Sequence, residues 1–197
     1  MIKPLDWIHN PPEGAILVDR ELRAWAETGI RSTFFPEQIN PASVDLRLGW
    51  RIRAPRYVWR VPVLKALYFR CHLANPERFP LWGEEIQARG YILRPGGIVL
   101  ASTVEITEIP LDCAGVLLSK SSPGRRGLQL LHVGWGDPGF FGTWTFELIN
   151  VAPWPIVLEP NKPIVQLVLV RLTSVPDVGY RDVGHYQGQV GPRAAVG

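Results

Sequence analysis

Residues 120–127 (KSSPGRRG) combine three cations, two hydroxyl side chains and two glycines within eight positions. A turn of this composition can present backbone N–H groups and charged donors to a phosphate. It is not a Walker A loop, because the GxxxxGK[ST] pattern is absent and no helical pattern follows. The alternative interpretation is a basic turn that only faces solvent.

Two carboxylates follow this turn along the chain. Asp137 lies in the turn-rich segment 136–142 (GDPGFFG), and Glu147 lies in the alternating segment 143–150 (TWTFELIN). Glu147 shares one face of that predicted strand with two threonines, and the aromatic residues share the other face. If the aromatic face is the core, Glu147 points outward; if the sheet curls around a ligand, Glu147 points into the cavity. The alternation leaves both interpretations open, and Asp137 could equally serve an Asx turn.

Short strands and turns must position these side chains. The sequence has 19 Pro and 19 Gly in 197 residues, which disfavours long helices. Residues 39–49 alternate apolar and polar side chains, and segments 91–110 and 156–172 each contain two apolar runs around a turn. One short helix is predicted between Asp19, which can cap it, and Gly29, which can close it. Strands spaced in this way indicate a closed or folded-over sheet.

The chain length indicates one domain, which we place at residues 1–174. Within it, residues 51–90 mix basic and aromatic side chains without a sustained period, so we interpret them as an irregular or inserted region. The tail, residues 175–197, has few large apolar side chains. It is either disordered or a flap that a ligand orders.

Charge and cysteine content argue against several functional classes. The 21 Lys and Arg against 18 Asp and Glu suit a small anionic ligand, and the sequence contains no basic tract that would indicate a nucleic-acid partner. Cys71 and Cys113 form no CxxC motif and no HxE motif is present, so a cysteine-ligated zinc site is not indicated. No apolar run reaches the ~18 residues of a membrane span, and the first residues lack the apolar region of a signal peptide. We therefore expect a cytoplasmic protein.

Four blocks of the sequence together resemble the dCTP deaminase branch of the dUTPase superfamily. In chain order they contain ILVDREL with INPASVDLRLG, STVEITEIP with LLSKSSPGRRGL, GDPGFFGTWTFELIN with LEPNKPIVQL, and YRDVGHYQGQVGPR. The joint occurrence of SSxGR, DPGFxGxxxxEL and a late YQGQ carries the resemblance. It implies a mainly β fold, a distorted jelly-roll-like β-barrel, in a homotrimer whose active sites lie between subunits. It also implies chemistry without zinc, with Mg²⁺ bound together with the nucleotide triphosphate.

The resemblance assigns three catalytic residues. Glu147 takes the place of the family's catalytic carboxylate, which would remove a proton from water, let hydroxide attack C4 of cytosine, and return protons to N3 and the leaving amine. Ser121 and Arg125 match the family's serine and arginine that position the water and stabilise charge.

Further positions match family residues that approach the nucleotide. The family's corresponding positions contact the triphosphate, the sugar or the base, or close the C-terminal flap. In this sequence they are Lys120, Ser122, Gly124, Arg126, His132, Asp137, Gln166, Tyr180, His185, Tyr186 and Gln189.

Departures from the family pattern concern the base loop and the flap. The loop between Gly127 and Asp137 is one residue shorter than usual, and residues 132–135 read HVGW in place of the typical His-x-Thr-Ala. His185 stands where many members have a lysine, so the positive charge there depends on pH. These changes bear on substrate choice and triphosphate affinity.

The predicted function is deamination of dCTP to dUTP and ammonia in pyrimidine deoxynucleotide metabolism. If Asp137 also activates water, the enzyme would continue to dUMP and pyrophosphate. One alternative is a diphosphatase for dUTP or a modified pyrimidine nucleotide. Another is a catalytically weak nucleotide-sensing protein that uses residues 51–90 as a partner surface.

Overall fold

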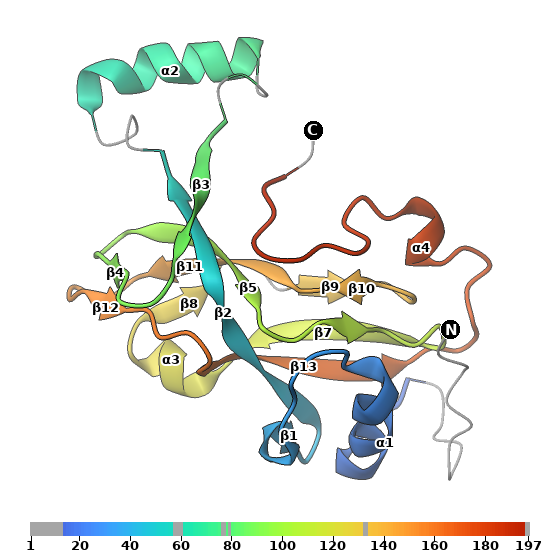
Figure 1. Ribbon diagram of the computed structural model, residues 1–197. Helices are drawn as coiled ribbons and strands as arrows, with labels where there is room; N and C mark the ends of the chain where they lie inside the picture. The colour runs from blue at the N-terminus through green and yellow to red at the C-terminus, as the bar shows by residue number, and fades with distance from the viewer. Residues whose placement is uncertain (1–13, 57–60, 76–77, 79, 132–133, 196–197) are drawn as a thin grey trace.

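The computed structural model describes residues 14–56, 61–75, 78, 80–131 and 134–195, and most of its regular structure is antiparallel strand (Figure 1). The strands are β1 (Ile39–Asn40), β2 (Ser43–Pro55), β3 (Trp82–Gln87), β4 (Ile92–Leu93), β5 (Ile98–Thr103), β6 (Thr107–Glu108), β7 (Cys113–Ser119), β8 (Leu128–Leu130), β9 (Gly134–Gly136), β10 (Phe141–Gly142), β11 (Thr145–Asn150), β12 (Ile156–Val157) and β13 (Pro163–Arg171). The helices are α1 (Asp19–Gly29), α2 (Pro62–Ala74), α3 (Ser121–Arg125) and α4 (Tyr180–Val183), with a 3₁₀ turn η1 (Pro36–Gln38).

One curved sheet organises the described part of the chain. Its strand order is β8-β11-β5-β2-β13-β7-β9, and β1 and β3 pair with β2 outside this path. The long strand β2 pairs with β13 over its first half and with β3 and β5 over its second, with register shifts where it changes partners. Two small pairs, β10 with β6 and β12 with β4, extend the curvature. The prediction of a mainly β, barrel-like fold is confirmed.

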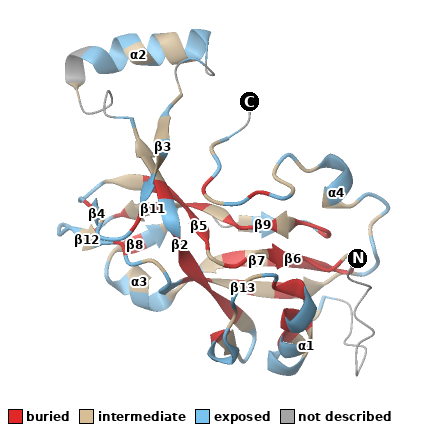
Figure 2. Ribbon diagram, viewed as in Figure 1, coloured by how far each residue is buried: buried red, intermediate tan, exposed pale blue. Residues whose placement is uncertain are grey.

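The core is apolar and lies on the inner face of this sheet (Figure 2). Trp144, Phe146 and Leu148 of the predicted 143–150 strand are all buried. Close packing requires glycine at position 136, because a Cβ there would lie 2.3 Å from the Trp144 ring. The aromatic face of that strand is therefore the core face, which settles one of the alternatives that the alternation left open.

Helix α1 forms where the sequence predicted it, but its cap differs. The cap residue is Val18, whose N–H donates to the Glu21 carboxylate at 3.0 Å, so the prediction of Asp19 as the cap was wrong. Asp19 is the first helical residue, where a carboxylate interacts favourably with the helix dipole. Trp25 anchors the helix, because its indole N–H donates to the Glu108 carbonyl at 3.0 Å.

Residues 51–90 are more ordered than the sequence indicated. They contain the end of β2, the return strand β3 and helix α2, which projects from the sheet at the tip of the β2–β3 hairpin (Figure 1). The alternative of an irregular region is wrong for these elements, and the alternative of an inserted region stays a prediction. The sequence pattern missed α2 because this helix is apolar on most sides, with Leu67 and Leu73 largely exposed. A helix without a polar face lacks the amphipathic period that sequence patterns detect. We refer to residues 56–82 as the excursion.

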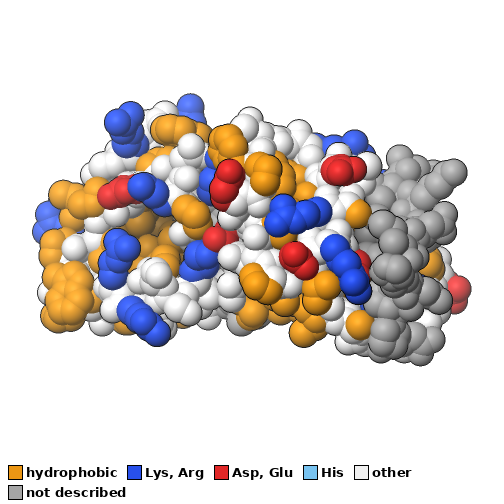
Figure 3. Space-filling model, turned by 90° about the horizontal axis from the view of Figure 1, so that it is seen from below, with side chains coloured by type: hydrophobic (Ala, Val, Ile, Leu, Met, Phe, Trp, Pro, Cys, Tyr) orange, Lys and Arg blue, Asp and Glu red, His pale blue; other side chains and the backbone are white. Residues whose placement is uncertain are grey.

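The surface carries no single track of positive charge on the face shown in Figure 3. Lys and Arg side chains there are interspersed with apolar and acidic ones. Among the helices of the described residues, none has the length and hydrophobicity required to span a membrane.

Candidate active site

The turn at residues 120–127 forms the short helix α3 between β7 and β8. Its main chain is held by bonds from the Gly124 N–H to the Lys120 carbonyl at 3.1 Å and from the Gly127 N–H to the Gly124 carbonyl at 2.9 Å. Gly127 has φ +86°, and a Cβ there would lie 2.4 Å from the Ala152 Cβ, so only glycine fits. The turn therefore presents Ser121 and Arg125 to solvent, and within the described residues neither side chain has a recorded partner.

A cavity of about 360 Å³ lies beside α3. Three cations, Lys120, Arg126 and Lys162, line it together with Ser122 and the carboxylate of Glu159. This grouping fits the predicted contacts of the basic turn with phosphate. Ser121, Arg125 and Glu147 do not line it.

Lys120 already has a partner inside its own chain. Its ammonium pairs with the carboxylate of Asp45 on β2, which also accepts a bond from the Asn40 side-chain amide at 2.9 Å. Gln166 on β13 lies directly across from Asp45 in the sheet register. Lys120 and Gln166 thus belong to one polar group, and a phosphate must compete with Asp45 for the ammonium.

Glu147 lies at the middle of β11 on the face opposite the core. It is half-buried, and its main-chain carbonyl accepts the Leu131 N–H at 2.9 Å. Within the described residues, its carboxylate has no recorded hydrogen bond or ion pair. A carboxylate that is partly shielded and unpaired can accept a proton from a bound water.

The single chain does not bring the three catalytic candidates into contact. No hydrogen bond or ion pair joins Glu147 to Ser121 or Arg125 in the described part of the structure. In addition, the sheet order places β5 and β2 between β11, which carries Glu147, and β13, which carries Gln166. The candidates form two separate groups on this chain, one around α3 and one on β11.

Asp137 is exposed at the start of the turn between β9 and β10, and its carboxylate accepts the Trp135 indole N–H at 2.9 Å. The Gly139 N–H donates instead to the Ile109 carbonyl, so the Asx-turn alternative is not what the structure shows. The Trp135 ring is 62% exposed beside this carboxylate. His132, also predicted here, lies outside the described residues.

The C-terminal segment, residues 175–195, begins with α4. The ring of Tyr180 packs edge-on against Phe140, with centroids 5.5 Å apart, and its hydroxyl accepts the Tyr186 N–H at 3.3 Å. Arg181 pairs with the buried carboxylate of Glu108 at 2.5 Å. The predicted residues Tyr180 and Tyr186 therefore lie in one anchored turn. His185 between them is exposed.

After α4 the segment runs along β10 and β11 towards Glu147. Gln189 forms a parallel bridge with Gly142, and its side-chain amide donates to the Thr143 carbonyl at 2.7 Å. The Arg193 N–H donates to the Thr145 hydroxyl at 3.1 Å, two residues before Glu147 on the same face. The C-terminal segment thus lies across the outer face of the strand that carries Glu147.

One buried acceptor in this region lacks a partner. Gln189 is 7% exposed, and its side-chain oxygen is buried with no hydrogen-bond partner in the described structure. Leaving such an atom unpaired is costly, and a donor from water or from a ligand would satisfy it. The sequence missed Gln187, whose side chain bonds to the Phe141 N–H and the Gly139 carbonyl. The YQGQ motif contains it and could have indicated it.

A cysteine nucleophile and a metal site are the other chemistries to consider in the described residues. Burial, with the Asp112 carboxylate nearby, raises the pKa of the Cys113 thiol far above its usual range, so this cysteine is not a nucleophile at neutral pH. No group of three His, Cys, Asp or Glu residues in the described part of the chain could hold a metal ion.

Comparisons with known proteins show which family this chain belongs to. A family model described as dCTP deaminase-like matches residues 16–172. The dCTP deaminase, dUMP-forming, of Mycobacterium leprae is 38% identical over 187 residues, covering 90% of this chain and 93% of the relative. The protein of the same name from Acidothermus cellulolyticus is 40% identical over 191 residues, covering 90% of this chain and 92% of the relative.

A solved structure has a similar fold. The crystal structure of 2′-deoxycytidine 5′-triphosphate deaminase from Agrobacterium tumefaciens aligns with a TM-score of 0.58 at 22% identity, covering 79% of this chain and 48% of that one. At this identity the similarity concerns the fold alone.

Proposed function

Because this chain belongs to the dCTP deaminase-like family, we propose that it hydrolyses dCTP to dUTP and ammonia and then hydrolyses dUTP to dUMP and pyrophosphate. The observation that carries the first step is the shielded, unpaired carboxylate of Glu147 on β11. The second step is supported by Asp137, whose carboxylate is exposed, and by the dUMP-forming name of the relatives.

In the proposed deamination, Glu147 accepts a proton from water, and the hydroxide attacks C4 of the cytosine ring. The same proton is delivered to N3, and a further transfer through the carboxylate releases the C4 amine as ammonia. Arg125 and Ser121 stabilise the charge that develops and position the water. Arginine suits this role because it keeps its proton throughout.

We further propose that each site is completed by a neighbouring copy in a homotrimer. Ser121 and Arg125 of one copy would face Glu147 of the next, which accounts for the absence of a contact among them within the described part of one chain. Mg²⁺ would enter bound to the triphosphate, where it neutralises phosphate charge, and the cations beside α3 would contact the remaining phosphate oxygens. Zinc has no role in this proposal.

A product assay tests the reaction. The purified protein is incubated with Mg²⁺ and dCTP, and separately with dUTP, and nucleotides and ammonia are measured over time. We expect ammonia and dUMP from dCTP, and dUMP from dUTP. Absence of ammonia from dCTP would overturn the deaminase proposal, and dUMP from dUTP alone would replace it by a diphosphatase. Tight dCTP binding without any turnover would replace it by a nucleotide sensor.

A mixing experiment tests the shared site. Ser121→Ala and Glu147→Gln chains are each expected to be inactive alone. When the two are co-expressed at equal levels, random trimers restore about a quarter of the wild-type sites if each site uses two chains. Sites built within one chain would give no restoration.

A further inference from the structure

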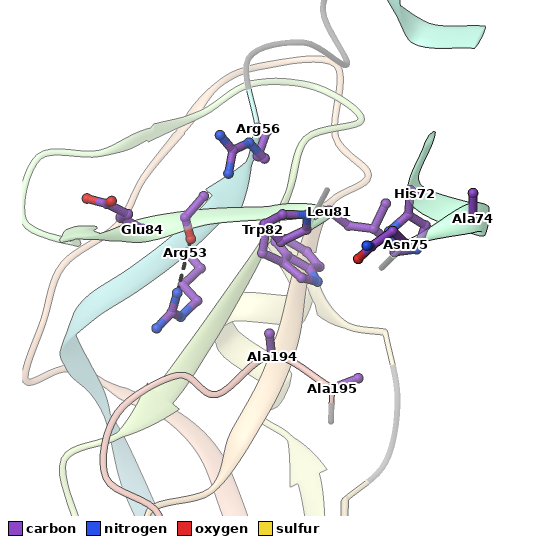
Figure 4. A pocket seen from close by; sticks show the side chains of 12 residues that line it. Arg53, Arg56, His72, Ala74, Asn75, Leu81, Trp82, Glu84, Ala194 and Ala195 are labelled. Carbon is purple, nitrogen blue, oxygen red and sulfur yellow. Dashed lines mark hydrogen bonds between the residues drawn. The ribbon is translucent and has the colours of Figure 1, made fainter. Parts of the chain in front are cut away.

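The excursion borders a second cavity (Figure 4). Its volume is about 940 Å³, and none of the described catalytic or substrate-binding candidates lines it. The walls come from the end of β2, the end of α2, β3 and the last described residues of the C-terminal segment. The residues that the argument uses are Arg53, Arg56, His72, Trp82, Glu84 and Ala194.

The lining combines cations with an aromatic ring. Arg56 is exposed, and no ion pair is recorded for it among the described residues. His72 comes from α2, and Trp82 is half-buried on β3 between them and Ala194 (Figure 4). Glu84 is the acidic residue of the lining, and its carboxylate points away from Trp82. An arginine binds anionic groups and a tryptophan stacks on flat rings, so the lining complements an aromatic anion.

Arg53 joins this cavity to the C-terminal segment. Its guanidinium donates to the Pro192 carbonyl at 2.8 Å and to the Gly83 carbonyl at 3.2 Å, and it pairs with Glu85 at 3.1 Å. One side chain thus ties β3, a wall of the cavity, to the segment that continues along Thr145 beside Glu147. A ligand that contacts Arg53 and β3 in this conformation therefore also favours the docked C-terminal segment.

We propose that this cavity is a regulatory binding site for a small aromatic anion of the size of a nucleoside monophosphate, and that its occupancy stabilises the docked C-terminal segment through Arg53. The cavity volume falls in the range of small-molecule sites. The binding itself does not depend on the proposed deaminase activity.

Calorimetric titration with adenosine 5′-monophosphate tests the site. A purine is chosen because the proposed catalytic site takes a pyrimidine. We expect saturable binding with a Kd of about 1 mM or tighter, weakened about fivefold or more by Arg56→Ala and by Trp82→Ala. Arg89→Ala, an exposed arginine outside the cavity, serves as the matched control and leaves binding unchanged. Glu147→Gln also binds the probe normally. Absence of saturable binding, or equal binding by the Arg56 and Trp82 variants, overturns the proposal.

Hydrogen exchange tests the coupling. With the probe bound, we expect the amides of Gly188 and Arg193 to exchange about three- to tenfold more slowly, because both donate the bonds that dock the segment. In Arg53→Gln, measured at a probe concentration that saturates this variant, we expect the protection to be lost. Binding without any change in exchange would overturn the regulatory part of the proposal.

Discussion

Two glutamates, Glu105 in the connection between β5 and β6 and Glu147 on β11, have opposite surroundings. Glu105 is fully buried, and its carboxylate accepts bonds from the Gln38 side chain at 2.9 Å, the Arg47 main chain at 2.8 Å and the Arg47 side chain at 2.6 Å. Glu147 is half-buried, and its carboxylate has no recorded partner in the described part of the chain. The Glu105 carboxylate therefore makes its hydrogen bonds within the fold, whereas the Glu147 carboxylate is left for other partners.

Arg47, the ion-pair partner of Glu105, also has several hydrogen-bond acceptors around its guanidinium. The Arg47 guanidinium also donates to Asn161 at 2.8 Å and to the Thr33 carbonyl, and it lies 4.9 Å from the centre of the Phe35 ring. A buried charge requires such compensation, or the cost of removing it from water exceeds what the fold can offset. The contrast between Glu105 and Glu147 indicates which polar groups can bind a substrate or a second copy. They are those without a recorded partner in the described residues, such as the Glu147 carboxylate and the side-chain oxygen of Gln189.

The largest expected effect is on turnover. Replacing Glu147 by Gln removes the proton acceptor, so we expect kcat for deamination to fall by about 10³-fold or more. The free energy of unfolding should change by no more than about 0.5 kcal/mol, because the carboxylate makes no recorded contact. Ammonia release measures kcat, and urea unfolding measures the free energy of unfolding. A fully active variant would remove Glu147 from the mechanism.

The next effect is on stability. Replacing Glu105 by Ala leaves the Arg47 charge buried without its partner, so we expect a loss of about 3–5 kcal/mol of unfolding free energy. Glu159→Ala is the control, because Glu159 is exposed and lies 4.0 Å from Lys162, and its loss should cost less than about 1 kcal/mol. Equal losses in the two variants would contradict the contrast between a saturated and an exposed carboxylate.

A smaller effect is expected at Asp137. Trp135→Phe keeps an aromatic ring but removes the N–H that holds the Asp137 carboxylate. We expect dUTP hydrolysis to slow about fivefold while deamination is unchanged, because the lost bond orients only that carboxylate. Separate rates with dCTP and dUTP check this, with Trp50→Phe as an exposed tryptophan control. An equal loss in both reactions would indicate a general structural role.

The smallest effect concerns His185. A lysine ammonium stays charged throughout the neutral range, so His185→Lys fixes a positive charge at this position. We expect this change to lower KM for dCTP about threefold near pH 8, an effect typical of exposed charge pairs. Steady-state KM of both proteins near pH 8 tests it. The same KM for both proteins near pH 8 would exclude His185 from triphosphate binding.

The sequence predicted strands in residues 39–49, 91–110, 143–150 and 156–172, the helix α1, and the candidate side chains around α3 and on β11, because these depend on local patterns and on contiguous motifs. It did not predict β3. It did not predict α2, whose apolar surface gives no amphipathic period. The sequence also did not predict that Arg53 contacts the C-terminal segment, because nothing local distinguishes this arginine from the others in residues 51–60. The roles of the site residues remain predictions that the experiments above test.

What the sequence determined by itself is the family, the residue types of the site and the turn that holds Ser121 and Arg125. The tertiary structure alone decided that Lys120 pairs with Asp45, that the C-terminal segment lies along β11, and that Glu147 faces away from the core. The physical reason is that these contacts join residues far apart in the chain. Their geometry depends on the register and curvature of the whole sheet, which no short segment encodes.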